Sequence, residues 1–270
     1  MLIDFHTHMF PPAVADRALG GIIERTKEIY DIDQEISFDG TLAGLKSSMK
    51  ETGVDLSVVL PIATKPTQYR TINKYALESM GEGIISFASL HPYQDNVDET
   101  LAEISASGFR GIKLHPDYQN VYADDEKFIS LVKKACGLGL YVVIHSGEDL
   151  GMRPPFRCTI ERLKRLLSSV DEERLVIAHM GGFNMWDEVL NELINTSAYF
   201  DTAVVSRYIS PEIYKRIIEE HGAEKILFGS DAPWEDPRET YAFLMDAGLE
   251  EEENELITHK NAEKILFGNN

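Results

Sequence analysis

Short apolar runs recur along the chain, and their number and order constrain the fold more than any other feature of the sequence. Most of these runs are continuously apolar, which is typical of parallel strands that are buried on both faces. Polar and mixed segments separate them. The eight predicted strands span residues 2–6, 55–63, 84–90, 109–115, 140–145, 174–179, 198–204 and 225–231.

Amphipathic segments lie between the predicted strands. Several have Ser, Thr or Asp near the start and Gly at the end, which is typical of capped helices; the clearest are 41–53, 97–108, 126–139 and 210–222. Alternating strands and helices with right-handed crossovers form either an open doubly wound sheet or a closed barrel. Eight repeats favour the barrel, so we predict an α/β fold of the (β/α)₈ TIM-barrel type.

No linker or low-complexity tract divides the chain, so we expect one domain over residues 1–270. The first repeat is longer than the others, because about 30 residues, Met9 to Gly40, separate the first strand from its helix. We interpret this long first loop as a lid over the catalytic face.

Composition excludes several classes of protein. A formal net charge of −19, from 26 basic and 45 acidic residues, would repel a nucleic-acid backbone. No apolar run reaches the roughly 20 residues that a membrane-spanning helix requires. The chain starts directly with a predicted strand rather than a signal segment, so we expect a cytoplasmic protein. The two cysteines, Cys136 and Cys158, are predicted to be reduced and to hold no metal.

Histidines cluster at the carboxyl ends of the predicted strands. Six of the eight in the chain lie there: His6, His8, His91, His115, His145 and His179. A parallel barrel gathers its chemistry at this edge. The pattern therefore predicts a metal-dependent enzyme.

The strongest candidate metal ligands are His6 and His8, which are two residues apart at a strand end and so project from the same face. His145 ends the fifth predicted strand and Asp231 the eighth. A closed barrel brings the first and eighth strands side by side, with the fifth across the mouth. Three imidazoles and one carboxylate suit one divalent ion, with Zn²⁺ preferred and Mn²⁺ or another divalent ion as alternatives.

His179 ends the sixth predicted strand, beside Gly181 and Gly182. It is either a further metal ligand or the group that positions and deprotonates a water molecule, since a free imidazole titrates near neutrality. A third interpretation is a histidine that is only hydrogen-bonded beside a flexible turn.

Six segments together carry a family resemblance: DFHTH (4–8), GFRGIKLHP (108–116), VVIHSG (142–147), LVIAHMGG (175–182), ILFGSDAPW (226–234) and HKNAEKILF (259–267). In these segments and their order the chain resembles the amidohydrolase superfamily, and more narrowly the amidohydrolase-2 family of metal-dependent hydrolases and decarboxylases. The resemblance implies one divalent metal, usually zinc, held by His6, His8, His145 and Asp231. It further implies that His179 activates water or substrate and that Asp231 also shuttles a proton.

Lys113 lies on the fourth predicted strand, where two-metal members of the superfamily carry a carbamylated lysine. In the amidohydrolase-2 branch a lysine in this K-L-H-P setting generally stays unmodified, so the resemblance favours one metal and a free ammonium that can pair with an anionic substrate. His115, before a proline, is a turn residue at the rim or a substrate contact. Arg153 is one of several basic residues after the strands that indicate a carboxylate-bearing substrate. Lys113, His115 and Arg153 are therefore our candidates for substrate binding.

The main functional expectation is a metal-dependent hydrolase, in which a metal-activated water attacks a small organic amide, ester or lactone. The alternative is a metal-dependent, non-oxidative decarboxylase of an aromatic or unsaturated carboxylic acid. A catalytically silent, ligand-binding barrel is a third hypothesis, which the intact set of candidate ligands disfavours. The expected partner is a small molecule, and a homo-oligomer remains open.

Overall fold

A computed structural model of the protein describes residues 1–268. Within this range every predicted apolar run contains a strand, and the third run contains two because the strand is interrupted at Phe87. The strands are β1 (Ile3–Thr7), β2 (Leu56–Val59), β3 (Ile84–Ser86), β4 (Ala88–Ser89), β5 (Gly111–Leu114), β6 (Tyr141–Ile144), β7 (Leu175–Ile177), β8 (Tyr199–Asp201) and β9 (Ile226–Leu227).

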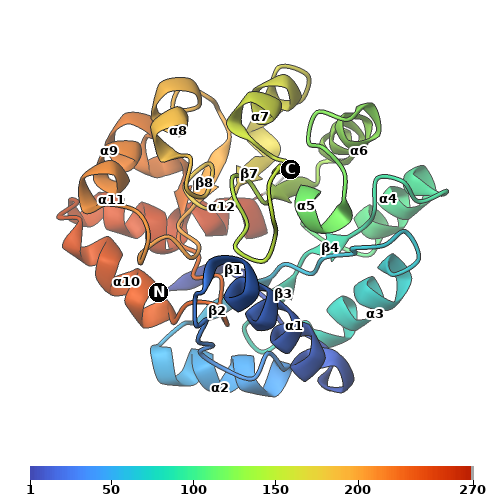
Figure 1. Ribbon diagram of the computed structural model, residues 1–270, viewed down its shortest axis with the longest axis horizontal. Helices are drawn as coiled ribbons and strands as arrows, with labels where there is room; N and C mark the ends of the chain where they lie inside the picture. The colour runs from blue at the N-terminus through green and yellow to red at the C-terminus, as the bar shows by residue number, and fades with distance from the viewer. Residues whose placement is uncertain (269–270) are drawn as a thin grey trace.

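All strand pairs are parallel and follow chain order, with β1-β2-β3 as one run and β4 to β9 as the other. The amide of Phe87 donates to Val59 O at 2.9 Å, so pairing with β2 continues across the interruption. The last strand returns to the first, since Phe5 N donates to Phe228 O at 2.8 Å and His8 N to Ala232 O at 2.7 Å. Figure 1 shows the strands surrounded by helices. The predicted (β/α)₈ barrel is confirmed.

The four helices predicted most clearly are confirmed, and their ends differ from the predicted ones by at most two residues. They are α2 (Leu42–Thr52), α4 (Val97–Ala106), α6 (Glu126–Gly137) and α9 (Pro211–His221). Side-chain caps explain three of their starts: Thr41, Asp125 and Ser210 each accept a hydrogen bond from a backbone N–H in the first turn. The remaining α-helices are α1 (Pro12–Tyr30), α3 (Tyr69–Ser79), α5 (Pro116–Gln119), α7 (Ile160–Leu167), α8 (Trp186–Glu192), α10 (Pro237–Asp246), α11 (Glu251–Glu255) and α12 (Asn261–Phe267).

Buried apolar side chains form the core on both sides of the strands. On β6, Val142 and Ile144 pack in the cluster that includes the surrounding helices, whereas Val143 packs with Phe5 and Leu227. The alternation of strand side chains between two faces explains why the predicted strands read as continuously apolar. Both cysteines are buried and free, as predicted.

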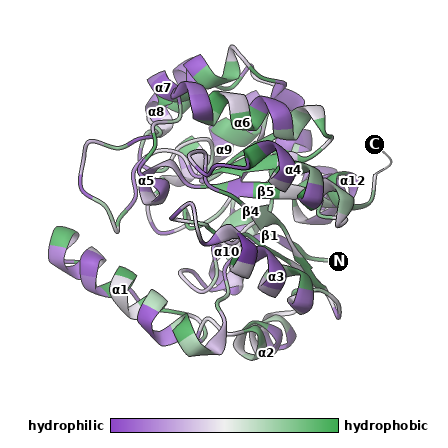
Figure 2. Cartoon of the chain, turned by 90° about the vertical axis from the view of Figure 1, so that its right-hand side faces the viewer, coloured by the Kyte–Doolittle hydropathy of each residue, from purple (hydrophilic) through white to green (hydrophobic). Residues whose placement is uncertain are grey.

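The segment expected to be a loop, Met9–Gly40, contains α1, a helix of 19 residues. It begins at Pro12 and ends at Tyr30, and the next residue, Asp31, has a left-handed backbone with φ of 57°. Figure 2 shows α1 standing apart from the ring of helices. One of its faces lines a cavity over the strand ends, which places a helix where the sequence predicted an irregular lid. Among residues 1–268, no helix is long and apolar enough to cross a membrane.

Candidate active site

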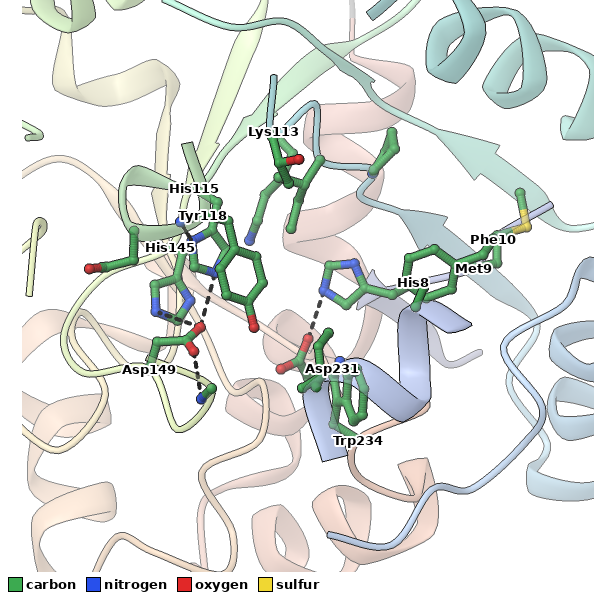
Figure 3. Close-up of a pocket in the computed structure, with 18 of the residues that line it drawn as sticks. His8, Met9, Phe10, Lys113, His115, Tyr118, His145, Asp149, Asp231 and Trp234 are labelled. Carbon is green, nitrogen blue, oxygen red and sulfur yellow. Dashed lines mark hydrogen bonds and ion pairs between the residues drawn. The ribbon is translucent and has the colours of Figure 1, made fainter. Parts of the chain in front are cut away.

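The ends of β1 and β9 bring His6, His8 and Asp231 together (Figure 3 labels His8 and Asp231). The Nε2 atoms of His6 and His8 lie 3.3 and 2.9 Å from Asp231 Oδ1. Asp231 has a left-handed backbone with φ of 65°, and its N–H donates to His6 O at 2.8 Å. This strained turn is where strands β9 and β1 meet, and it directs the carboxylate at both imidazoles.

Electrostatics keep His6 and Asp231 in the forms that bind cations. Burial, and then the charge of Lys113, hold the pKa of His6 well below its ordinary value, so its ring is neutral. Burial alone would raise the pKa of Asp231, but the imidazoles of His6 and His8 outweigh it and hold the pKa below its ordinary value. The buried Oδ1 of Asp231 accepts no well-directed hydrogen bond within residues 1–268. An ionised oxygen facing two imidazole nitrogens is a donor set that fits a divalent ion.

Asp201, the last residue of β8, contacts the His6 ring at Nδ1. Its Oδ2 accepts a hydrogen bond from His6 Nδ1 at 2.8 Å, which leaves the lone pair of His6 on Nε2. That nitrogen lies 3.1 Å from Lys113 Nζ. Burial lowers the pKa of Lys113 to about 8, against the opposing charges of Asp201 and Asp231. Lys113 therefore lies inside the barrel beside the candidate ligands.

His145 does not join His6, His8 and Asp231 in this structure. Its Nδ1 lies 2.9 Å from His179 Nε2, and its Nε2 lies 3.1 Å from Glu148 O. It belongs instead to a second group with His115 and Asp149, in which His115 Nε2 lies 3.2 Å from Asp149 Oδ2.

The geometry of this second group does not suit one metal ion. The rings of His115 and His145 are stacked, with centroids 3.9 Å apart and planes within 9° of parallel. An imidazole lone pair lies in the plane of its ring, so two parallel rings cannot both direct a lone pair at one ion. Tyr118 extends the stack on the other side of His115, with centroids 4.0 Å apart. We therefore regard His115 and Tyr118 as a wall of the cavity.

His179 follows β7 and has a left-handed backbone with φ of 62°. Its N–H donates to Asp201 Oδ1 at 2.9 Å, and its Nδ1 donates to Ala203 O at 2.9 Å. Because a carbonyl oxygen can only accept, Nδ1 carries a proton and Nε2 is the nitrogen that can exchange one. Trp186 Nε1 also donates to His179 O at 3.1 Å, which fixes the turn.

A cavity of about 1000 Å³ opens over these residues (Figure 3). The histidines, Lys113 and Asp231 form its polar part, and much of the remaining wall is apolar, including Met9, Phe10, Ile62, Ile72, Phe183 and Trp234. Helix α1 covers one side with residues three or four apart, as expected for one helical face: Val14, Arg17, Ala18, Gly21, Ile22 and Arg25.

Only two of the three predicted substrate-binding residues line the cavity. Lys113 and His115 line the cavity, whereas Arg153 does not; it is exposed and pairs with Glu28 at 3.0 Å. His91 also lies outside the cavity, with its Nε2 3.0 Å from Gln119 O.

Sequence reasoning missed four residues of the site. Asp201 lay inside the predicted strand 198–204, and the available signal was an acidic residue in a largely apolar run. Tyr118, Arg17 and Arg25 carried none, because short helix α5 and helix α1 were not predicted. Figure 3 shows the Tyr118 hydroxyl pointing into the cavity.

Comparison with known proteins decides the family. A family model described as amidohydrolase, the amidohydrolase-2 family, matches residues 3–268. The chain belongs to this family. The match spans the strand ends that carry His6, His8, His145, His179 and Asp231. No curated protein matches the sequence significantly.

Solved structures with the same fold include decarboxylases and a probable hydrolase. A 5-carboxyvanillate decarboxylase from Novosphingobium aromaticivorans, with bound manganese and 3-methoxy-4-hydroxy-5-nitrobenzoic acid, has a TM-score of 0.73 and 15% identity, covering 98% of this chain and 97% of its own. A 2,6-dihydroxybenzoate decarboxylase from Rhizobium has a TM-score of 0.68 and 16% identity, covering 98% of each chain. A probable 2-pyrone-4,6-dicarboxylic acid hydrolase from Acinetobacter baumannii, with citric acid bound, has a TM-score of 0.65 and 16% identity, covering 98% of each chain.

Proposed function

We propose that this protein is a metal-dependent decarboxylase of an aromatic or unsaturated carboxylic acid. The observation that carries the proposal is the His6–His8–Asp231 cluster at one side of a largely apolar cavity. Decarboxylases of aromatic acids among the structures with the same fold support it. The proposal reverses the order expected from sequence, in which hydrolysis came first.

The proposed metal ligands are His6, His8 and Asp231, with His145 as the fourth. His145 would have to leave its contact with His179 to take this role, and rotation of an imidazole ring is a small change. When bound, one divalent ion would supply a positive charge that orients the substrate carboxylate and its neighbouring oxygen. Manganese is present in the 5-carboxyvanillate decarboxylase of the same fold, so Mn²⁺ and Zn²⁺ are both candidates.

The cavity supplies contacts for an aromatic acid. Its four acidic side chains already have partners: Asp117 lies 3.6 Å from Arg157, Glu148 accepts a hydrogen bond from Asn184, and Asp149 and Asp231 face histidines. Arg17 and Arg25 pair with no carboxylate within residues 1–268. We propose that these two arginines and Lys113 attract the anionic substrate, and that the apolar wall takes its ring.

In the proposed reaction the bond between the substrate carbon and its carboxylate breaks, and CO₂ leaves. The electron pair stays on the substrate carbon, which then takes a proton. His179 is our candidate donor through Nε2, because its Nδ1 proton is engaged with Ala203 O. The apolar wall favours the step, since charge that is concentrated on the carboxylate spreads into the ring.

Product analysis tests the proposal. The purified protein, loaded with Mn²⁺ or Zn²⁺, is incubated with hydroxybenzoic and related unsaturated acids, and CO₂ and the remaining product are measured. We expect CO₂ release that a chelator abolishes and added metal restores. Metal-dependent turnover of amides, esters or lactones without CO₂ would reject decarboxylation.

Hydrolysis is the second candidate, supported by the probable hydrolase of the same fold. The same residues serve it: the cluster would hold the metal, and His179 Nε2 would accept a proton from the attacking water. A panel of lactones and esters, run beside the acids, distinguishes the two reactions.

A further inference from the structure

Asp201 is completely buried at the end of β8, and its two oxygens serve different partners. Oδ2 accepts the hydrogen bond from the His6 ring. Oδ1 accepts from the backbone N–H groups of His179 and Ala203, at 2.9 and 3.2 Å. One carboxylate thus contacts both a proposed metal ligand and the proposed proton donor.

The consequence for His6 concerns its tautomer. A carboxylate can only accept, so the neutral ring carries its proton on Nδ1 and its lone pair on Nε2, toward Asp231. The consequence for His179 is parallel. Asp201 holds its backbone and that of Ala203, and Ala203 O in turn accepts from His179 Nδ1.

We infer that Asp201 is a positioning residue that sets the tautomer of His6 and the placement of His179 together. The inference rests on the proposed function for the roles of these two histidines, but its geometry stands without them. Partners of this kind typically change metal affinity about 10- to 100-fold when they are replaced. A single substitution at Asp201 should therefore weaken metal binding and misplace the proton donor.

The informative variant is Asp201→Asn, because the structure dictates how the amide would sit. Two backbone N–H groups face Oδ1, so the amide oxygen must stay there, and the amide NH₂ must face His6 Nδ1. An NH₂ group donates, so it favours the lone pair of His6 on Nδ1 and the proton on Nε2. The lone pair would then point away from Asp231.

Thr202→Val is the matched control. Thr202 is the next residue, is equally buried, and exchanges hydrogen bonds with the Gly229 backbone without contacting either histidine. The Thr202→Val variant shows how the loss of a buried hydrogen bond at this strand end changes the free energy of unfolding and the Kd for Mn²⁺.

The test combines Mn²⁺ titration with ¹⁵N NMR of the histidine side chains. We expect Asp201→Asn to raise the Kd for Mn²⁺ by about 10- to 100-fold relative to Thr202→Val, and to move the His6 proton to Nε2. An unchanged Kd together with an unchanged tautomer in a folded Asp201→Asn protein would overturn the inference.

The unmutated protein provides a second measurement if Asp201→Asn does not fold. Without metal, His6 should show the tautomer protonated on Nδ1, and the opposite tautomer at His6 would overturn the inference. If the unmutated protein binds no Mn²⁺, the proposed function fails, while the tautomers still decide the role of Asp201.

Discussion

Glu235 offers a quantitative test of how burial controls charge near the site. It follows Trp234 in the segment between β9 and α10 and is 1% exposed. One carboxyl oxygen accepts a hydrogen bond from Thr240, and the other, Oε2, has no partner within residues 1–268. Burial raises the pKa of Glu235 from 4.5 to about 7, against hydrogen bonds that lower it.

The sign of the effect follows from proton binding. Between pH 4.5 and 7 the unfolded chain has lost the Glu235 proton while the folded protein still holds it, so stability falls as pH rises. Below this window the effect is absent, and above it the effect is complete. A shift of about 2.5 pKa units corresponds to about 3 kcal/mol, since each unit is about 1.4 kcal/mol. Glu235→Gln removes this pH dependence.

We therefore expect the stability difference, Glu235→Gln minus the unmutated protein, to increase by about 3 kcal/mol from pH 4 to pH 8. Urea unfolding followed by tryptophan fluorescence measures it at each pH. Asp4, whose pKa burial raises to about 7, contributes to both proteins and cancels in the difference. Glu103→Gln, at an exposed position of α4, is the control and should give a flat difference. A flat difference for Glu235→Gln as well would refute the reasoning.

Three further outcomes follow from the geometry. His179→Ala should keep its metal, by elemental analysis, and lose about 10²- to 10⁴-fold in turnover of whichever substrate is found; metal loss would make it a ligand instead. Burial raises the thiol pKa of Cys136 and Cys158 to about 12. An aromatic disulfide reagent should therefore react with these thiols only after unfolding, and rapid labelling of the native protein would contradict this. Gly147→Ala should lower the free energy of unfolding by about 3 kcal/mol or more, because the new Cβ would meet the Phe183 backbone at 2.2 Å. The control is Gly53→Ala, at a glycine with a similar φ but open space around it, and it should lower the free energy of unfolding by only about 1 kcal/mol.

The barrel could be predicted from the sequence because its strands are buried on both faces. Residues such as Val142, Val143 and Ile144 are all apolar, so each strand leaves a continuous run that needs no knowledge of its neighbours. Helix α1 was missed for the opposite reason. It stands over the cavity with few buried residues, and Gly20 and Gly21 in its middle weaken the helical signal.

The candidate site could be predicted only in part. His6, His8 and Asp231 meet because the first and last strands close the barrel, which topology alone dictates. The position of His145 depends on ring rotation, and its contacts with His179 and Glu148 O leave no trace in the sequence. Arg153 followed the correct strand, but its loop turns it toward Glu28 on α1. Which basic residues face the cavity depends on loop conformation, which local sequence does not determine.

Metal content per chain tests the central claim most directly. The unmutated protein and Asp231→Asn are purified in parallel without added metal and measured by elemental analysis, with circular dichroism to show that both are folded. We predict about one divalent ion per chain in the unmutated protein, as expected for one site of histidines and a carboxylate, and a sharp loss in Asp231→Asn. Equal metal in the two proteins would contradict the proposed site, and two ions per chain would indicate a bridging, modified Lys113.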